Sequence, residues 1–118
     1  MSRRLSDWLT HLHDLHVRSI DLELGRIQRV AQTLQIKQPI CPVVTVAGTN
    51  GKGSVVGFLE ALYVNAGYNV AAFTSPYLIS FNEQFRFNQQ WIEDEKLCRY
   101  FEKINHARGD ITLTYFEF

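Results

Sequence analysis

The sequence has few cysteines, no excess of charge of either sign and no long hydrophobic run. Its 118 residues include two cysteines, Cys41 and Cys98, which excludes a disulfide framework or a cysteine-rich zinc module and fits a reducing cytosol. Twelve basic residues balance twelve acidic ones, so the chain has no excess of positive charge that would attract a nucleic acid or an anionic membrane. No apolar run approaches the roughly 20 residues of a membrane helix, and no signal peptide is readable. We therefore expect a cytoplasmic protein without nucleic-acid or membrane partners.

What is present is the composition of a single globular domain, with 46% hydrophobic and 13% aromatic residues. Hydrophobic residues at helical spacing predict a first helix over residues 8–15, with Ser6 or Asp7 as its cap. The same spacing predicts a second helix over about residues 22–34. The prolines that follow, Pro39 and Pro42, mark a linker because proline ends a helix.

The central part of the sequence predicts a strand, a glycine-rich loop, a helix and a second strand. Residues 43–47 are mostly β-branched, which is typical of a buried parallel strand. They lead into the loop of residues 48–54 and a helical pattern that Gly67 closes, and residues 69–74 resemble another strand. Right-handed crossover makes this unit a parallel βαβ. We therefore predict an α/β fold, a P-loop-containing parallel sheet with flanking helices.

The last part of the sequence carries weaker signals until a final helix. Extended structure is indicated around residues 85–87, and helical spacing over residues 94–107 ends at Gly109. Residues 111–118 have the composition of a strand. An aromatic strand with no polar tail after it is an unusual place for a domain to stop, so we expect a truncated sequence.

The loop between strand and helix carries the chemistry. Gly51 and Gly53 let successive backbone N–H groups point into one concavity at a helix N-terminus, which suits a phosphate. Lys52 supplies a point charge for phosphoryl oxygens, and the Ser54 hydroxyl suits Mg²⁺ or phosphate. The match to G-x-x-x-x-G-K-[ST] is imperfect, because Val46 replaces the first glycine and Gly53 separates lysine from serine. The alternative is an ordinary glycine-containing turn.

Several segments together resemble one family. The loop at residues 48–54, Ser75-Pro76 and the run from Thr114 to Glu117 are similar to the folylpolyglutamate synthase/dihydrofolate synthase family of the Mur ligase superfamily. The stretches at residues 8–22 and 107–111 resemble it as well. The resemblance implies that residues 1–118 are the amino-terminal part of an ATP-binding, Mur-ligase-like central domain, and that the family's C-terminal Rossmann-like domain is absent from this chain.

The resemblance also implies the activity. Members of this family use ATP to phosphorylate the carboxylate of dihydropteroate, or of the terminal glutamate of a folate. The amine of L-glutamate then attacks the acyl phosphate and forms an amide, with ATP and Mg²⁺ as cofactors. The family is mostly monomeric. The short stretch before the loop favours a bifunctional enzyme, and this chain alone is expected to turn over little or nothing.

Site residues follow from the same resemblance. The ATP-binding residues it implies are Thr49, Asn50, Gly51, Lys52, Gly53 and Ser54, with Lys52 also catalytic. Ser75 is implied as a Mg²⁺ ligand, although from the residues alone it is a turn serine at a strand end. The implied pteroate-binding residues are Thr114, Tyr115, Phe116 and Glu117. From the residues alone, Glu117 would instead be a Walker-B-like metal ligand.

Two positions depart from the family pattern, and two other functions stay open. Tyr77 stands where the family has histidine. Residues 81–86 resemble a flexible loop of the family, in which Gln84 stands in place of an arginine, so Arg86 is the remaining cation of that loop. His11, His13 and His16 form no convincing metal set, since only the last two share a helix face. The alternatives are another Mur-superfamily amide ligase and a non-catalytic nucleotide-binding module.

Overall fold

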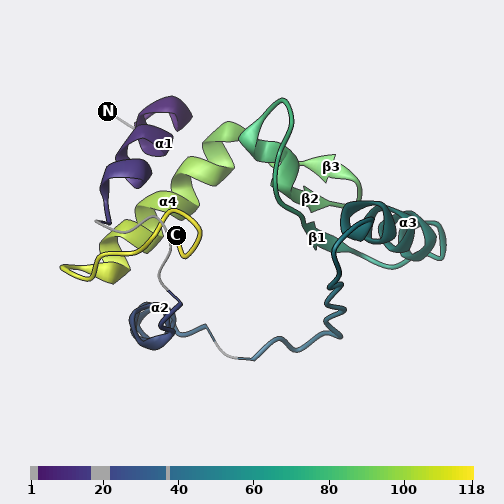
Figure 1. Cartoon of the computed structure of the whole chain (residues 1–118), viewed down its shortest axis with the longest axis horizontal. Helices are drawn as coiled ribbons and strands as arrows, with labels where there is room; N and C mark the ends of the chain where they lie inside the picture. Colours follow the sequence, from purple (N-terminus) through teal and green to yellow (C-terminus); the bar gives the residue numbers. More distant parts are fainter. Residues whose placement is uncertain (1–2, 17–21, 37) are drawn as a thin grey trace. The chain divides into compact units, whose positions relative to one another are not determined.

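The computed structural model describes residues 3–16, 22–36 and 38–118, which belong to two units (Figure 1). The helical unit consists of Met1–Ile40 with Asp94–Phe118, and the sheet unit of Cys41–Glu93. Ile20 and Asp21, which contribute to the family resemblance, lie outside the described residues. None of the helices in the described ranges is long and apolar enough to cross a membrane.

The helical unit is built from α1 (Leu5–Asp14), α2 (Gly25–Thr33) and α4 (Asp94–Arg108). All three were expected from the sequence, and α4 contacts both of the others. The predicted cap of α1 is wrong by two or three residues. Arg4 is the N-cap, and its backbone N–H donates to the Asp7 carboxylate at 3.2 Å. Asp7 thus acts from inside the first turn, where a carboxylate also suits the helix dipole.

Apolar packing between α1 and α4 forms the core of the helical unit. Trp8 is 2% exposed, and its ring centroid lies 5.7 Å from that of Phe101 and 6.1 Å from that of Phe118. The other buried hydrophobic residues of this unit are Leu12, Val30, Leu97, Cys98 and Leu113. Burial raises the pKa of the Cys98 thiol, and nearby acidic residues such as Asp94 add to the effect.

The sheet unit contains one long helix and a small sheet. Its elements are α3 (Lys52–Asn65), β1 (Ala71–Phe73), the 3-10 turn η1 (Phe81–Gln84), β2 (Phe85–Phe87) and β3 (Gln90–Trp91). The strand order is β1-β2-β3 and both pairings are antiparallel, with Ala72 opposite Arg86. Asn88 and Gln89 join β2 to β3 with φ angles of 47° and 67°. Two successive positive φ angles define the tight turn whose twist suits a hairpin.

The prediction of an α/β fold is confirmed, but the predicted parallel βαβ unit is wrong for the described residues. Residues 43–47 form no strand, and Val43 and Val44 are 66% and 63% exposed. The second strand forms only as β1, and its partner is the antiparallel β2. A β-branched run becomes a strand only where another strand meets its N–H and C=O groups. Within the described chain, no strand pairs with residues 43–47.

The predicted strand at residues 111–118 is also wrong. The chain turns there, because the N–H groups of Glu117 and Phe118 both donate to the Thr114 carbonyl. The Glu117 carboxylate accepts the Thr114 N–H at 2.8 Å. That N–H is therefore engaged within the turn and is not offered to a neighbouring strand.

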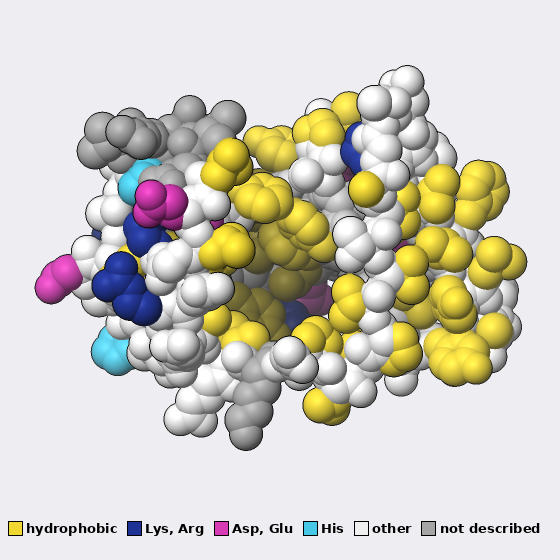
Figure 2. Space-filling view, turned by 60° about the horizontal axis from the view of Figure 1, so that its bottom comes forward, with side chains coloured by type: hydrophobic (Ala, Val, Ile, Leu, Met, Phe, Trp, Pro, Cys, Tyr) yellow, Lys and Arg dark blue, Asp and Glu magenta, His cyan; other side chains and the backbone are white. Residues whose placement is uncertain are grey.

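The sheet unit leaves much apolar surface uncovered around α3. Hydrophobic side chains gather on the right side of Figure 2, where α3 lies. Phe58 and Leu62 of this helix are 72% and 66% exposed. Apolar surface that gathers in this way is typical of interaction faces.

Candidate functional site

The Gly-Lys loop, residues 48–54, lies at the start of α3 in the sheet unit. Gly51 precedes the helix with φ 76° and ψ 3°, a left-handed conformation that favours glycine. Nothing lies within 4 Å of the position that a Cβ on Gly51 would take, so the backbone conformation rather than crowding demands glycine there. The residues from Thr49 to Ser54 are all exposed. The first N–H groups of a helix have no partner within it and carry its positive dipole end, so this loop can receive an anion.

Lys52 is the first residue of α3, and its side chain folds back over the loop. Its Nζ donates to the Gly48 carbonyl oxygen at 2.6 Å. The ammonium group is therefore held beside the loop backbone by an oxygen acceptor. A phosphoryl oxygen offers the same lysine a stronger, charge-assisted hydrogen bond.

Ser75 follows β1 in an exposed turn, and the Ser75–Pro76 peptide bond is cis. In the described ranges, no group of three or more histidine, cysteine, aspartate or glutamate side chains is arranged to hold a metal ion. A hydroxyl oxygen suits a hard cation such as Mg²⁺, which often takes its remaining ligands from phosphate and water. The exposed Ser75 hydroxyl is a donor of this type.

Arg86 of β2 is engaged in internal contacts of the sheet unit. Its Nε donates to Glu60 Oε2 at 2.9 Å, and Nη1 donates to Thr74 Oγ1 at 2.9 Å and to the Glu83 carbonyl at 2.8 Å. The second Glu60 oxygen accepts the Gln89 N–H at 3.1 Å. The sequence predicted that Arg86 is the remaining cation of its loop. In the structure, Arg86 is a structural group of the sheet unit.

Glu83 organises the residues that precede η1. Its carboxylate accepts the backbone N–H groups of Leu78, Ile79 and Ser80 at 2.7–3.1 Å. The bond from Leu78, followed by that from Ser80, lowers the pKa of Glu83 below its ordinary value. Three N–H groups on one carboxylate fix the course of this loop.

Of the two positions that depart from the family pattern, Tyr77 precedes η1 and Gln84 is the last residue of η1. Tyr77 is 41% exposed, and its ring makes an edge contact with Phe81 at 5.8 Å between centroids. Gln84 is 7% exposed, and its Nε2 lies 3.4 Å from the Phe81 carbonyl oxygen. The glutamine thus points into the unit rather than presenting a polar group to a ligand.

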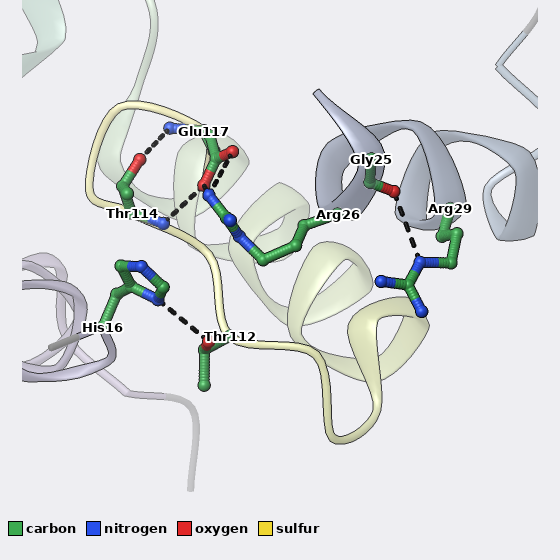
Figure 3. A network of polar contacts seen from close by, with 7 residues as sticks. All are labelled: His16, Gly25, Arg26, Arg29, Thr112, Thr114 and Glu117. Carbon is green, nitrogen blue, oxygen red and sulfur yellow. Dashed lines mark hydrogen bonds and ion pairs between the residues drawn. The ribbon is translucent and has the colours of Figure 1, made fainter. Parts of the chain in front are cut away.

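The segment of residues 114–117 lies in the helical unit and is fixed by an ion pair (Figure 3). Arg26 Nη2 of α2 lies 3.0 and 3.1 Å from the two carboxylate oxygens of Glu117. Thr114 is 3% exposed, and its Oγ1 accepts the Glu117 N–H at 3.3 Å. Arg26 was not expected from the sequence, because no local pattern links residues 91 positions apart.

A histidine of α1 contacts this segment, and a second histidine, just after α1, contacts a residue just before the segment. Tyr115 stacks on His13, with ring centroids 4.6 Å apart, and His16 Nδ1 lies 2.9 Å from Thr112 Oγ1. Phe116 is 74% exposed. The segment therefore combines a fixed carboxylate with an outward-facing aromatic ring, which suits a planar heteroaromatic ligand.

Known proteins share both the sequence and the fold of this chain. No protein-family model matches it. The dihydrofolate synthase/folylpolyglutamate synthase of Escherichia coli is 43% identical over 114 residues, which are 97% of this chain and 27% of that protein. A solved structure of the Escherichia coli protein in complex with DHPP and ADP has a TM-score of 0.94 at 42% identity. The match covers 98% of this chain and 28% of the solved chain. The solved structure of a bifunctional relative with Mn, AMPPNP and L-glutamate bound has a TM-score of 0.90 at 39% identity. That match covers 98% of this chain and 28% of the solved chain.

These similarities identify the class of protein to which the fold is related. Its α/β fold, with the Gly-Lys loop at the start of a helix, is that of a Mur-ligase-like protein. The chain is homologous to the folylpolyglutamate synthase/dihydrofolate synthase family and corresponds to its amino-terminal portion. It spans about a quarter of the length of the curated relatives that it matches.

Proposed function

We propose that this chain is the amino-terminal part of an ATP-dependent carboxylate–amine ligase of folate biosynthesis. The observation that carries the proposal is its similarity, over 97% of the chain, to dihydrofolate synthase/folylpolyglutamate synthases. The reaction joins L-glutamate to dihydropteroate or to a folate. The carboxylate oxygen of the acceptor attacks the γ-phosphorus of ATP, and ADP leaves. The glutamate amine then attacks the acyl carbon, and phosphate leaves with the carboxylate oxygen.

The Gly-Lys loop is the proposed ATP site. Thr49, Asn50 and the glycines line the phosphates, and Lys52 exchanges its bond to the Gly48 carbonyl for one to a phosphoryl oxygen. Its positive charge then stabilises the charge that develops during phosphoryl transfer. Support comes from the left-handed Gly51 and from the exposed start of α3.

Ser75 is proposed as a ligand of Mg²⁺. Ser54, the last residue of the Gly-Lys loop, is proposed to offer its hydroxyl to the metal or to a phosphate. The metal supplies charge neutralisation at the phosphoryl group when it is bound. The chain itself contributes hydroxyl oxygens from two exposed serines, and the nucleotide contributes phosphate oxygens.

Thr114, Tyr115, Phe116 and Glu117 are proposed to bind the pteroate part of the acceptor. The exposed ring of Phe116 offers a face for stacking, and Glu117 offers a carboxylate held by Arg26. A carboxylate accepts hydrogen bonds from the N–H groups of a heteroaromatic ring.

The apolar surface of the sheet unit supports the proposed domain organisation. Exposed Phe58 and Leu62 of α3, together with the unpaired residues 43–47, suit a larger ATP-binding domain that packs on this face. A second, Rossmann-like domain would follow it. We further propose that the whole enzyme is a cytoplasmic monomer.

A chimera tests the proposed function. Residues 1–118 would replace the matching amino-terminal portion of the Escherichia coli relative. We expect ADP release that requires both L-glutamate and dihydropteroate. Lys52→Ala should lower kcat at least about 100-fold, as expected when a group that stabilises transition-state charge is lost. Lys96→Ala, an exposed lysine of α4, is the matched control and should leave kcat unchanged.

Three outcomes would redirect the proposal. A chimera that folds and binds ATP without any glutamate-dependent turnover would favour the non-catalytic nucleotide-binding module. Turnover with a peptidoglycan-type acceptor and none with a pteroate would favour another Mur-superfamily ligase. Glutamate-dependent ADP release by the isolated 118-residue chain would contradict the expectation that the chain alone turns over little or nothing.

A further inference from the structure

The guanidinium group of Arg86 joins three separate parts of the sheet unit. It bonds Glu60 in the middle of α3, Thr74 directly after β1, and the Glu83 carbonyl in η1. All three bonds are 2.8–2.9 Å long. Charge-assisted bonds of this length are among the stronger polar contacts in a protein.

The ion pair of Arg86 with Glu60 is buried. The Glu60 side chain is 4% exposed and that of Arg86 is 17% exposed. Glu60 lies on α3, the helix that begins with Lys52 of the Gly-Lys loop. The pair therefore attaches β2 to the helix that carries the proposed ATP site.

The other two bonds hold both ends of the loop that contains Ser75. Thr74 is the residue before Ser75, and its hydroxyl accepts from Arg86. Glu83 lies at the far end of the loop, where its carbonyl accepts from Arg86 while its carboxylate accepts three N–H groups of residues 78–80. One guanidinium group thus fixes where the loop leaves β1 and where it enters β2.

We propose that Arg86 is a positioning residue that holds the Ser75 turn relative to α3, so that the metal-binding hydroxyl and the Gly-Lys loop keep one geometry. Arg86 itself touches neither nucleotide nor metal. The inference rests on the proposed function, since it takes Ser75 as a metal ligand. It predicts that loss of Arg86 weakens the contribution of the metal to nucleotide binding and spares the contribution of the loop.

The test compares AMPPNP binding by the chimera described above with and without Mn²⁺, by isothermal titration calorimetry. Mn²⁺ should tighten AMPPNP binding to the unsubstituted chimera. Arg86→Met should remove about 10-fold or more of that gain, the loss typical when a residue behind a metal ligand is removed. AMPPNP affinity without metal should change less than about 2-fold, because the Gly-Lys loop is intact. Arg99→Met, an exposed arginine of α4, is the matched control.

A second pair of variants leaves the buried ion pair in place. Thr74→Val removes the hydroxyl that accepts from Arg86, and Thr74→Ser keeps one. We expect the Mn²⁺-dependent gain to fall with valine and to recover with serine, which a general loss of stability would not produce. The electron paramagnetic resonance spectrum of bound Mn²⁺ should likewise change with valine and recover with serine.

Two results would overturn the inference in distinguishable ways. An unchanged Mn²⁺-dependent gain in Arg86→Met and Thr74→Val, with AMPPNP still bound, contradicts the positioning role alone. Failure of the unsubstituted chimera to bind AMPPNP contradicts the proposed ATP site, and the inference with it.

Discussion

The two units of the chain are stabilised by different kinds of contact. Among the residues that the structure describes, seven of the eight buried hydrophobic ones lie in the helical unit, and Phe81 lies in the sheet unit. The sheet unit instead buries Glu60, Asn82 and Gln84. Apolar packing stabilises the helical unit, whereas hydrogen bonds and an ion pair stabilise the sheet unit, which contains the Gly-Lys loop and Ser75. Directional bonds fix positions more narrowly than apolar contacts do, which suits a site for phosphate and metal.

The largest effect is expected from a cavity in the helical unit. Phe101→Ala should lower the free energy of unfolding of that unit by about 3–5 kcal/mol, because a buried ring in contact with Trp8 and Phe118 is lost. Tyr100→Ala, a half-exposed neighbour on the same helix, is the control. Urea unfolding followed by Trp8 fluorescence in a Trp91→Phe background measures the loss. Equal effects of the two substitutions would contradict the apolar core.

The matching change in the sheet unit breaks its buried ion pair. Glu60→Gln should destabilise the sheet unit by about 2–4 kcal/mol, because Arg86 loses its charged partner. Glu95→Gln, an exposed acid of α4, is the control. Hydrogen exchange should quicken at Gln89 and Thr74, whose N–H groups bond to Glu60 and to the Gln84 carbonyl. Faster exchange in the helical unit alone would contradict the role of this ion pair in the sheet unit.

A smaller effect is expected where the helical unit uses a polar bond. Arg26→Gln should cost about 2 kcal/mol, the usual value of a hydrogen bond to a charged group, because Glu117 loses its cation. Exchange at the Glu117 and Phe118 amides, which bond to the Thr114 carbonyl, should quicken. Arg29→Gln on the same helix is the control (Figure 3). An effect as large as that of Phe101→Ala would mean that the two units do not differ as described.

The smallest effect is a dependence on pH. The pKa of Glu83 in the folded chain is lowered from 4.5, so its capping contribution is complete above that value and disappears as pH falls through the lower, folded pKa. The Leu78, Ile79 and Ser80 amide resonances should shift together on acidification, and Glu83→Gln should remove the shift. Asp7, whose pKa the Arg4 side chain lowers from 3.8, provides the comparison in the helical unit. Amides that titrate with a midpoint above 4.5 would contradict this role.

Local signals in the sequence predicted local structure. The helices α3 and α4, and Gly67 with φ 89° after α3, follow from spacing and from glycine chemistry. The family resemblance of the chain is confirmed as well. The roles implied for Lys52 and Ser75 are still predictions.

Pairing between distant residues could not be predicted. Whether residues 43–47 become a strand depends on a partner, which a β-branched run does not specify. The bonds of Arg26 with Glu117 and of Arg86 with Glu60 join residues 91 and 26 positions apart. Arg86 was expected to be a loop cation because its segment resembles a loop of the family, and only the folded chain brings Glu60 to it.

The turn between β2 and β3 leaves room for directed improvement of the protein. Gln89 adopts φ 67° with a side chain, a conformation that costs an ordinary residue about 1 kcal/mol relative to glycine. Its bond to Glu60 uses the backbone N–H, which any substitution except proline retains. Gln89→Gly would create Asn-Gly, the pair that such turns favour. An engineer could thus raise the melting temperature in a thermal scan without altering any group proposed to take part in catalysis.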